Sequence, residues 1–120
     1  MILDGRPQLF ALQAEICKTL ADANRLRILH ELRTGEISVG QLVSSLNLPQ
    51  SSVSHHLRVL RERSIVLTRR EGTTIHYRLA DERIALACDL VREVLLGSLV
   101  RRQELATSMG FSNRKSQIET

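Results

Sequence analysis

The chain has 120 residues, a length typical of one domain. Aromatic residues make up 2% of it and Trp is absent, so the core must be aliphatic, which favours packed helices over an all-β sandwich. The same scarcity argues against a surface that binds single strands by stacking bases on aromatic rings. The formal net charge of +4 permits a polyanionic partner but does not require one.

Two helices are predicted after an arm over residues 1–7. The first, over 8–21, has apolar side chains on two flanks: Leu9, Leu12, Ile16 and Leu20, and Phe10, Ala14, Cys17 and Ala21. So wide an apolar arc indicates more than one packing neighbour, and another subunit would be one candidate. Asp22 is expected to cap a second helix over about 23–34, which Gly35 ends. Its solvent side is expected to carry Arg25, Arg27 and Arg33.

Residues 38–63 predict two further helices with a tight break between them. Ser38 and Gln41 have the spacing of a capping box at the start of the first helix. Pro49 ends that helix, because proline disfavours the α conformation in the residue before it. The pattern is therefore typical of two short helices joined by a turn.

The second of these helices, starting near residue 50, has two unlike faces at 100° per residue. Its apolar face carries Val53, Leu57 and Leu60, and its polar face carries Ser51, Ser54, His55 and Arg58. Hydroxyl, imidazole and guanidinium groups can hydrogen-bond base edges and phosphates, so such a helix, set by a short turn against another, is suited to a DNA major groove. The alternative is a helical hairpin whose outer face is merely solvated.

After residue 63 the apolar period changes from 3.6 to 2, which predicts a β-hairpin. One alternating set is Ile65, Leu67, Ile75, Tyr77 and Leu79. Glu71-Gly72 lies between the two runs and predicts a tight turn. The tip is basic and rich in hydroxyls, which suits contact with phosphates or the minor groove, although a solvated turn has the same composition. It carries Arg69, Arg70, Thr73 and Thr74.

Asp81 is expected to cap a last helix of about 25 residues, near 40 Å long. One stripe of this helix carries Ile84, Cys88, Val91, Leu95 and Leu99. The helix is long for so small a domain, and a two-fold related partner would bury the part that projects beyond the core. Residues 108–120 are polar and lack periodicity, so a flexible C-terminal tail is expected after a domain over 1–107.

The order of five helices, with a winged hairpin before the last, resembles the ArsR/SmtB family of bacterial winged helix–turn–helix repressors. The matching segments are TLADANRLRILHEL at 19–32, GEISVGQL at 35–42, SSVSHHLRVLRE at 51–62 and RREGTTIHYRLAD at 69–81. The chain departs from the family at Pro49, where relatives commonly have Ser or Thr before the reading helix. The resemblance implies a mainly α fold with a small β-hairpin wing, and a homodimer formed through the first and last helices.

The resemblance also implies a transcriptional repressor that binds a palindromic operator in double-stranded DNA and is released by an inducer. One reading helix would enter each of two successive major grooves. The residues that it places against DNA are Gln50, Ser51, Ser52, Ser54, His55 and Arg58 on the helix, and Arg69, Arg70, Thr73 and Thr74 on the wing. His56 is expected to point toward the core and to be hydrogen-bonded.

Two metal sites common in the family are absent from the sequence. Residues 37–40 contain no Cys-x-Cys, and the last helix contains no histidine. Cys17 and Cys88 lie on the helices expected to form the dimer, so one hypothesis is a dithiol that binds a thiophilic metal or metalloid, or that responds to oxidants or sulfur species. Inert packing is the favoured alternative, because Cys often behaves as a small buried hydrophobe. No other cofactor is predicted.

Other classes of protein fit the sequence less well. The start MILDGRPQLF lacks a long apolar run, and the longest uncharged apolar stretch, 94–100, is too short for a bilayer, so we expect a soluble, cytoplasmic protein with no membrane partner. An enzyme is not expected, since no nucleotide loop, paired carboxylates or thiol–base pattern is present. A winged-helix module that docks a protein and has no operator is the alternative, but docking faces favour apolar or aromatic anchors.

Overall fold

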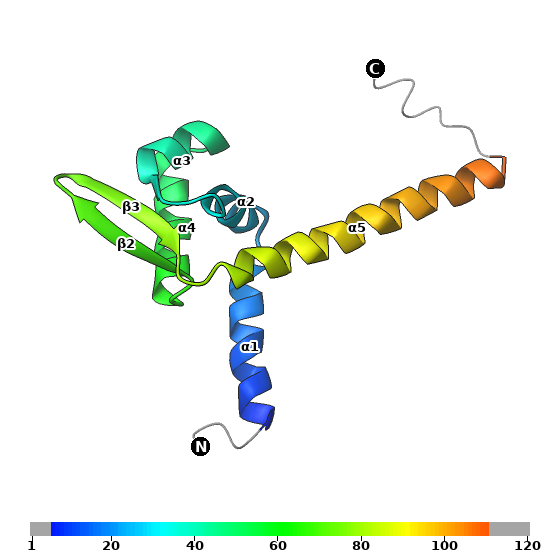
Figure 1. Cartoon of the computed structure of the whole chain (residues 1–120), viewed down its shortest axis with the longest axis horizontal. Helices are drawn as coiled ribbons and strands as arrows, with labels where there is room; N and C mark the ends of the chain where they lie inside the picture. Colours follow the sequence, from blue (N-terminus) through cyan, green and yellow to red (C-terminus); the bar gives the residue numbers. More distant parts are fainter. Residues whose placement is uncertain (1–5, 111–120) are drawn as a thin grey trace. The chain divides into compact units, whose positions relative to one another are not determined.

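The computed structural model describes residues 6–110, and its elements follow the predicted order (Figure 1). The helices are α1 (Arg6–Leu20), α2 (Ala23–Leu32), α3 (Val39–Leu46), α4 (Gln50–Glu62) and α5 (Arg83–Ser108). The strands are β1 (Ile37–Ser38), β2 (Val66–Glu71) and β3 (Thr74–Leu79). The prediction of a mainly helical fold with a hairpin before the last helix is confirmed. Helix α1 begins inside the stretch predicted as an arm, and residues 111–120 of the predicted tail lie outside the described residues.

The described residues fall into two units, the first ending at Ala85 and the second beginning at Leu86. The boundary lies within the first turn of α5, so the first unit contains α1 to α4 and the whole sheet. This first unit therefore holds both parts of the predicted DNA-binding surface, the second helix of the motif and the hairpin.

The core of the first unit is aliphatic, as the composition predicts. It takes Ile28, Leu29 and Leu32 from α2, Leu42 and Leu46 from α3, Val53, Leu57 and Leu60 from α4, and Ile65, Val66 and Leu79 from the hairpin region. Burying one such side chain contributes about 1.5–3 kcal/mol. The buried residues of α4 are Val53, Leu57 and Leu60 of its apolar stripe and the neighbouring His56, so packing against α2, α3 and β2 turns the polar stripe of α4 toward solvent.

Local hydrogen bonds explain where the helices begin. The Asp22 carboxylate accepts from the backbone N–H groups of Asn24 and Arg25, and so caps α2 as predicted. Ser38 and Gln41 form the predicted capping box at the start of α3. Helix α3 ends at Leu46 with Asn47 as its C-cap, whose φ of 54° is left-handed, and α4 follows Pro49, an N-cap position that offers no side-chain hydrogen bond. A break of three residues, 47–49, thus separates α3 from α4.

The sheet is antiparallel with the strand order β1–β3–β2. Glu71 pairs with Thr74, so the turn consists of Gly72 and Thr73, and Gly72 has a φ of 62° that suits glycine. The tip of the hairpin of β2 and β3 points away from α2, α3 and α4 of the same unit (Figure 1). Val66 is fully buried and Leu67 is 39% exposed, so Leu67 does not share the burial of Ile65, with which the alternating pattern grouped it.

Helix α5 contains 26 residues, close to the predicted length, and the Asp81 carboxylate accepts from the backbone N–H of Arg83 at its start. Most of its large apolar side chains are exposed: Leu86, Leu90, Val91, Val94, Leu95, Leu96, Leu99, Val100 and Leu105. The predicted stripe is therefore part of a wider apolar surface. In the part of the chain that the structure describes, no helix is both long and apolar enough to cross a membrane.

Candidate nucleic-acid interface

The polar face of α4 is exposed along its whole length. The structure leaves Gln50, Ser51, Ser54, His55 and Arg58 exposed and Ser52 half-buried. The Arg58 guanidinium lies 3.1 Å from His55 Nδ1, and since a guanidinium can only donate, this ring nitrogen is the acceptor and Nε2 carries the proton of the neutral ring. Two groups able to bond base edges or phosphates therefore lie together, one helical turn apart.

The opposite face of α4 is anchored by a polar contact as well as by apolar packing. His56 is 8% exposed, and its Nδ1 accepts from Arg25 at 3.3 Å. Its Nε2 lies 4.0 Å from the Asp22 carboxylate. Burial lowers the pKa of His56, and the charges of Arg25 and His55 lower it further, while Asp22 opposes them. The prediction of a packed, hydrogen-bonded His56 is confirmed.

On the wing, Arg70, Thr73 and Thr74 are exposed at the tip of the hairpin. Arg69 is also exposed, but its guanidinium contacts two carboxylates. Its Nε and Nη2 donate to Glu36 at 3.0 and 2.6 Å, and its Nη1 donates to Glu71 at 2.7 Å. Hydrogen bonds from Arg69 lower the pKa of both carboxyls, and both carboxylates raise the pKa of Arg69. Within residues 6–110, the Arg70 guanidinium has no such partner.

The sequence did not identify this triad of Glu36, Arg69 and Glu71. Because side chains alternate along a strand, residues 69 and 71 lie on the same face of β2, and this spacing could have predicted their contact. Glu36 lies in the segment between α2 and β1, and only the pairing of β1 with β3 brings it to the wing. Arg69 thus links the hairpin to the segment that leads into α3.

The helices expected to form a dimer expose apolar side chains. On α1, Leu9 is 44%, Phe10 61% and Leu12 55% exposed. Cys17 on α1 is exposed and Cys88 on α5 is half-buried, both as thiols, and they belong to different units. Among residues 6–110 no three His, Cys, Asp or Glu side chains are grouped as a metal site would need. The described structure therefore supports an apolar contact surface more directly than a metal centre.

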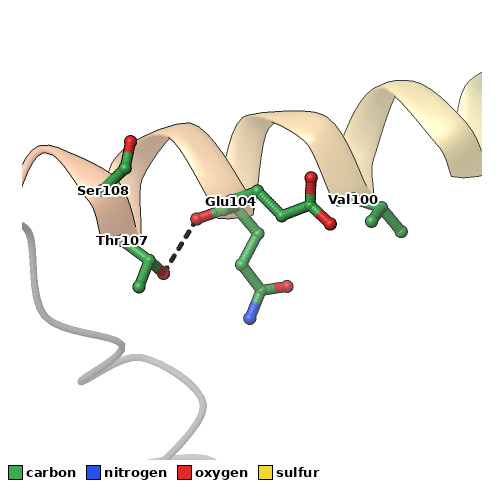
Figure 2. Close-up of a pocket in the computed structure, with 5 residues that line it drawn as sticks. Val100, Glu104, Thr107 and Ser108 are labelled. Atoms are coloured by element: carbon green, nitrogen blue, oxygen red, sulfur yellow. Dashed lines mark hydrogen bonds between the residues drawn. The ribbon is translucent and has the colours of Figure 1, made fainter.

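One hollow in the surface lies on the last turns of α5. Figure 2 shows Val100, Glu104, Thr107 and Ser108 around it, and the Thr107 hydroxyl donates to the Gln103 carbonyl at 3.0 Å. All the residues that line this hollow come from α5, so no second element encloses it. Ligand sites are usually concave and enclosed by several elements, and this hollow is therefore not the functional site.

A short turn joining two helices, an exposed polar face on the second helix and a β-hairpin directly after it define a winged helix–turn–helix protein. Comparison with known proteins narrows this class. The model of the arsR family of bacterial regulatory proteins matches residues 22–67. The HTH-type transcriptional regulator KmtR of Mycobacterium tuberculosis is 45% identical over 73 residues, which is 61% of this chain. The chain spans 56% of the length of KmtR.

Two solved structures extend the comparison. Rv0081 of M. tuberculosis has a TM-score of 0.70 and 40% identity, with 78% of this chain and 95% of that chain covered. Mb0332 of Mycobacterium bovis, described as a homodimeric winged helix–turn–helix DNA-binding domain, has a TM-score of 0.70 and 33% identity, with 80% and 89% covered. The chain belongs to the ArsR family of transcriptional regulators.

Proposed function

We propose that this chain is a transcriptional repressor that binds operator DNA with α4 in the major groove. The observation that carries the proposal is the division of α4 into a buried apolar face and an exposed face of hydroxyl, imidazole and guanidinium groups. An α-helix fits the major groove, where these groups can distinguish base pairs. A helix that served only to cover the core would not need this chemistry on its outer side. Binding over a promoter would exclude polymerase, and such a protein would work in the cytoplasm.

The same proposal assigns the exposed apolar surfaces of α1 and α5 to a homodimer. Side chains such as Phe10 at 61% and Val94 at 70% exposure are costly to leave in water, and a second copy would cover them. The structural relative Mb0332 is described as homodimeric. A two-fold dimer presents two copies of α4, which fits a palindromic operator with half-sites about 34–36 Å apart.

The contacts with DNA are divided between helix and wing. Gln50, Ser51, Ser52, Ser54, His55 and Arg58 of α4 would meet base edges and nearby phosphates. Arg70, Thr73 and Thr74 would meet the backbone beside the groove. Arg69 belonged to the same predicted set, and its two carboxylate partners lead us to assign it to holding the wing in place.

Release by an inducer acting at Cys17 and Cys88 remains a hypothesis. The exposure of Cys17 supports it, since a reagent can reach this thiol in the single chain. A thiophilic metal, a metalloid or an oxidant would act through the two thiols and change the dimer. A Cys17→Ser/Cys88→Ser variant should then stay bound to DNA when wild type is released by arsenite, persulfide or peroxide. Equal release of both proteins from DNA would show that the two cysteines do not sense the inducer and only pack against their neighbours.

Electrophoretic mobility shift with the upstream region of the gene tests the central proposal. Wild type should bind with an affinity that falls steeply with salt. Arg58→Ala should weaken specific binding by about 1–3 kcal/mol if the Arg58 guanidinium donates two hydrogen bonds to one guanine. Arg33→Ala is the matched control, because Arg33 is exposed at the C-cap of α2 and belongs neither to α4 nor to the wing. If no fragment shifts and a protein partner is recovered instead, the chain is a docking module.

A further inference from the structure

A single guanidinium connects the end of α1 to the reading helix α4. Arg25 Nε donates to the Thr19 carbonyl at 2.7 Å, and Arg25 Nη1 donates to His56 Nδ1 at 3.3 Å. Thr19, in the last turn of α1, is 7% exposed and His56 is 8% exposed. We call these two hydrogen bonds from one guanidinium the Arg25 fork. Because the guanidinium is planar and rigid, the separation of α1 and α4 at this point depends on the geometry of the fork.

The polar side chains around the Arg25 guanidinium all have partners. The Asp22 carboxylate accepts from the backbone N–H groups of Asn24 and Arg25, and it lies 4.0 Å from His56 Nε2. No buried side-chain nitrogen or oxygen within residues 6–110 lacks a hydrogen-bond partner. A satisfied polar network in a poorly solvated place fixes one arrangement of its members. The next residue along α4 is His55, which lies on the face assigned to DNA.

We propose that Arg25 and His56 are positioning residues for DNA reading, and that they set the angle of α4 relative to α1. The inference rests on the proposed function, in which α1 contributes to the subunit contact. In a two-fold dimer the reading helices must enter grooves about 10–10.5 base pairs apart. A change in the angle between α1 and α4 therefore changes which spacing of half-sites the dimer accepts, even though neither residue touches DNA.

The contact also depends on the protonation of His56. The neutral ring offers Nδ1 as an acceptor, whereas the protonated ring carries a proton on both nitrogens and cannot accept from Arg25. The ionisable groups that face it are Asp22 and Arg25 from α2 and its N-cap, and His55 from α4. Acidification breaks the fork and loosens the angle that it holds.

The experiment measures affinity for a series of operators whose half-site spacing changes by one base pair at a time. Arg25→Lys keeps the charge but cannot bond both Thr19 and His56, and it should bind the optimal spacing about tenfold more weakly and flatten the spacing profile. His56→Asn can offer an amide oxygen near the position of Nδ1, so it should keep the wild-type profile. This variant should also lose the part of the acid-induced weakening that wild type shows below pH 6.5.

Arg27→Lys is the matched control. Arg27 also lies on α2 and donates to the Leu46 carbonyl at 2.9 Å, but this bond leads to α3 and not to α4. The control should keep the spacing profile. A ratio of affinities for two spacings does not depend on how much of the protein is folded, so lost stability alone would not change it.

The outcomes separate the two proposals. If wild type prefers one spacing and Arg25→Lys keeps that preference undiminished, Arg25 does not position α4 and the inference is wrong. A His56→Asn variant that loses the spacing preference would also overturn it. If wild type binds every operator of the series no more tightly than unrelated DNA, the proposed function itself is wrong.

Discussion

The wing offers a sharp prediction, because two neighbouring arginines with the same charge differ in their partners. Arg69 contacts the carboxylates of Glu36 and Glu71, whereas Arg70 in the described structure contacts neither. A guanidinium that neutralises a phosphate releases counterions, and each such contact contributes about −0.9 to the slope of log affinity against log salt. Arg70→Ala and Arg69→Ala should therefore have different effects on the salt dependence of binding.

The magnitude follows from the number of contacts. A dimer carries two copies of Arg70, so Arg70→Ala should make the slope shallower by about 1.8, equivalent to about a twelvefold difference over a fourfold change in salt. Arg69→Ala should leave the slope close to the wild-type value and weaken binding by a similar factor at every salt concentration, because the wing loses its link to Glu36. The assay is a fluorescence-anisotropy titration of one labelled operator between about 50 and 200 mM salt.

A double variant, Glu36→Gln/Glu71→Gln, provides the complementary test. It removes both carboxylate charges and leaves Arg69 in place. If Arg69 holds the wing, the double variant should bind more weakly than wild type. Tighter binding with a steeper slope, or an Arg69→Ala slope reduced as much as that of Arg70→Ala, would show that Arg69 contacts DNA and would refute the reasoning.

Three further predictions test other parts of the account. Leu57 is fully buried, so Leu57→Ala should lower the free energy of unfolding by about 2–5 kcal/mol in a urea titration, and a loss below 1 would contradict the assigned core. Arg69 holds the pKa of Glu36 below 4.5, so this contact stabilises the fold above pH 4.5, and the stabilisation is lost as the pH falls through the lowered pKa. In Arg69→Ala the pKa of Glu36, followed by NMR, should rise back toward 4.5. An unchanged pKa would contradict the ion pair. Leu95, 55% exposed on α5, should lie in the subunit contact, so Leu95→Asp should give monomers by analytical ultracentrifugation, while an intact dimer would place the contact elsewhere.

The helical part of the fold was predictable because its signals are local. The capping box of Ser38 and Gln41, the Asp22 cap and the apolar stripe of α4 each depend on residues a few positions apart, and all three are confirmed. The two-residue strand β1 was hard to predict, because two residues show no periodicity. Its pairing with β3 depends on residues about 40 positions away.

The polar contacts behind the candidate site were harder to predict. Arg25 was expected on the solvent side of α2, yet it is half-buried and reaches across to His56, 31 positions later in the chain. Arg69 was assigned to DNA from its place at the tip, and its partner Glu36 is 33 positions earlier. Sequence patterns identify which side chains can bond, but tertiary packing decides which of them meet. The exposed face of α4 was predictable because the opposite face carries Val53, Leu57 and Leu60 at helical spacing, whereas the partner of the buried His56 on that side was not.

Hydroxyl-radical footprinting of the purified protein on its upstream DNA tests most directly whether paired copies of α4 read one duplex. Two protected stretches, centred about one helical turn of 10–10.5 base pairs apart, should appear at a stoichiometry of two chains per site, and both should disappear together in Leu95→Asp. A single protected stretch bound by one chain, or uniform cleavage at protein concentrations that saturate the mobility shift, would contradict the account.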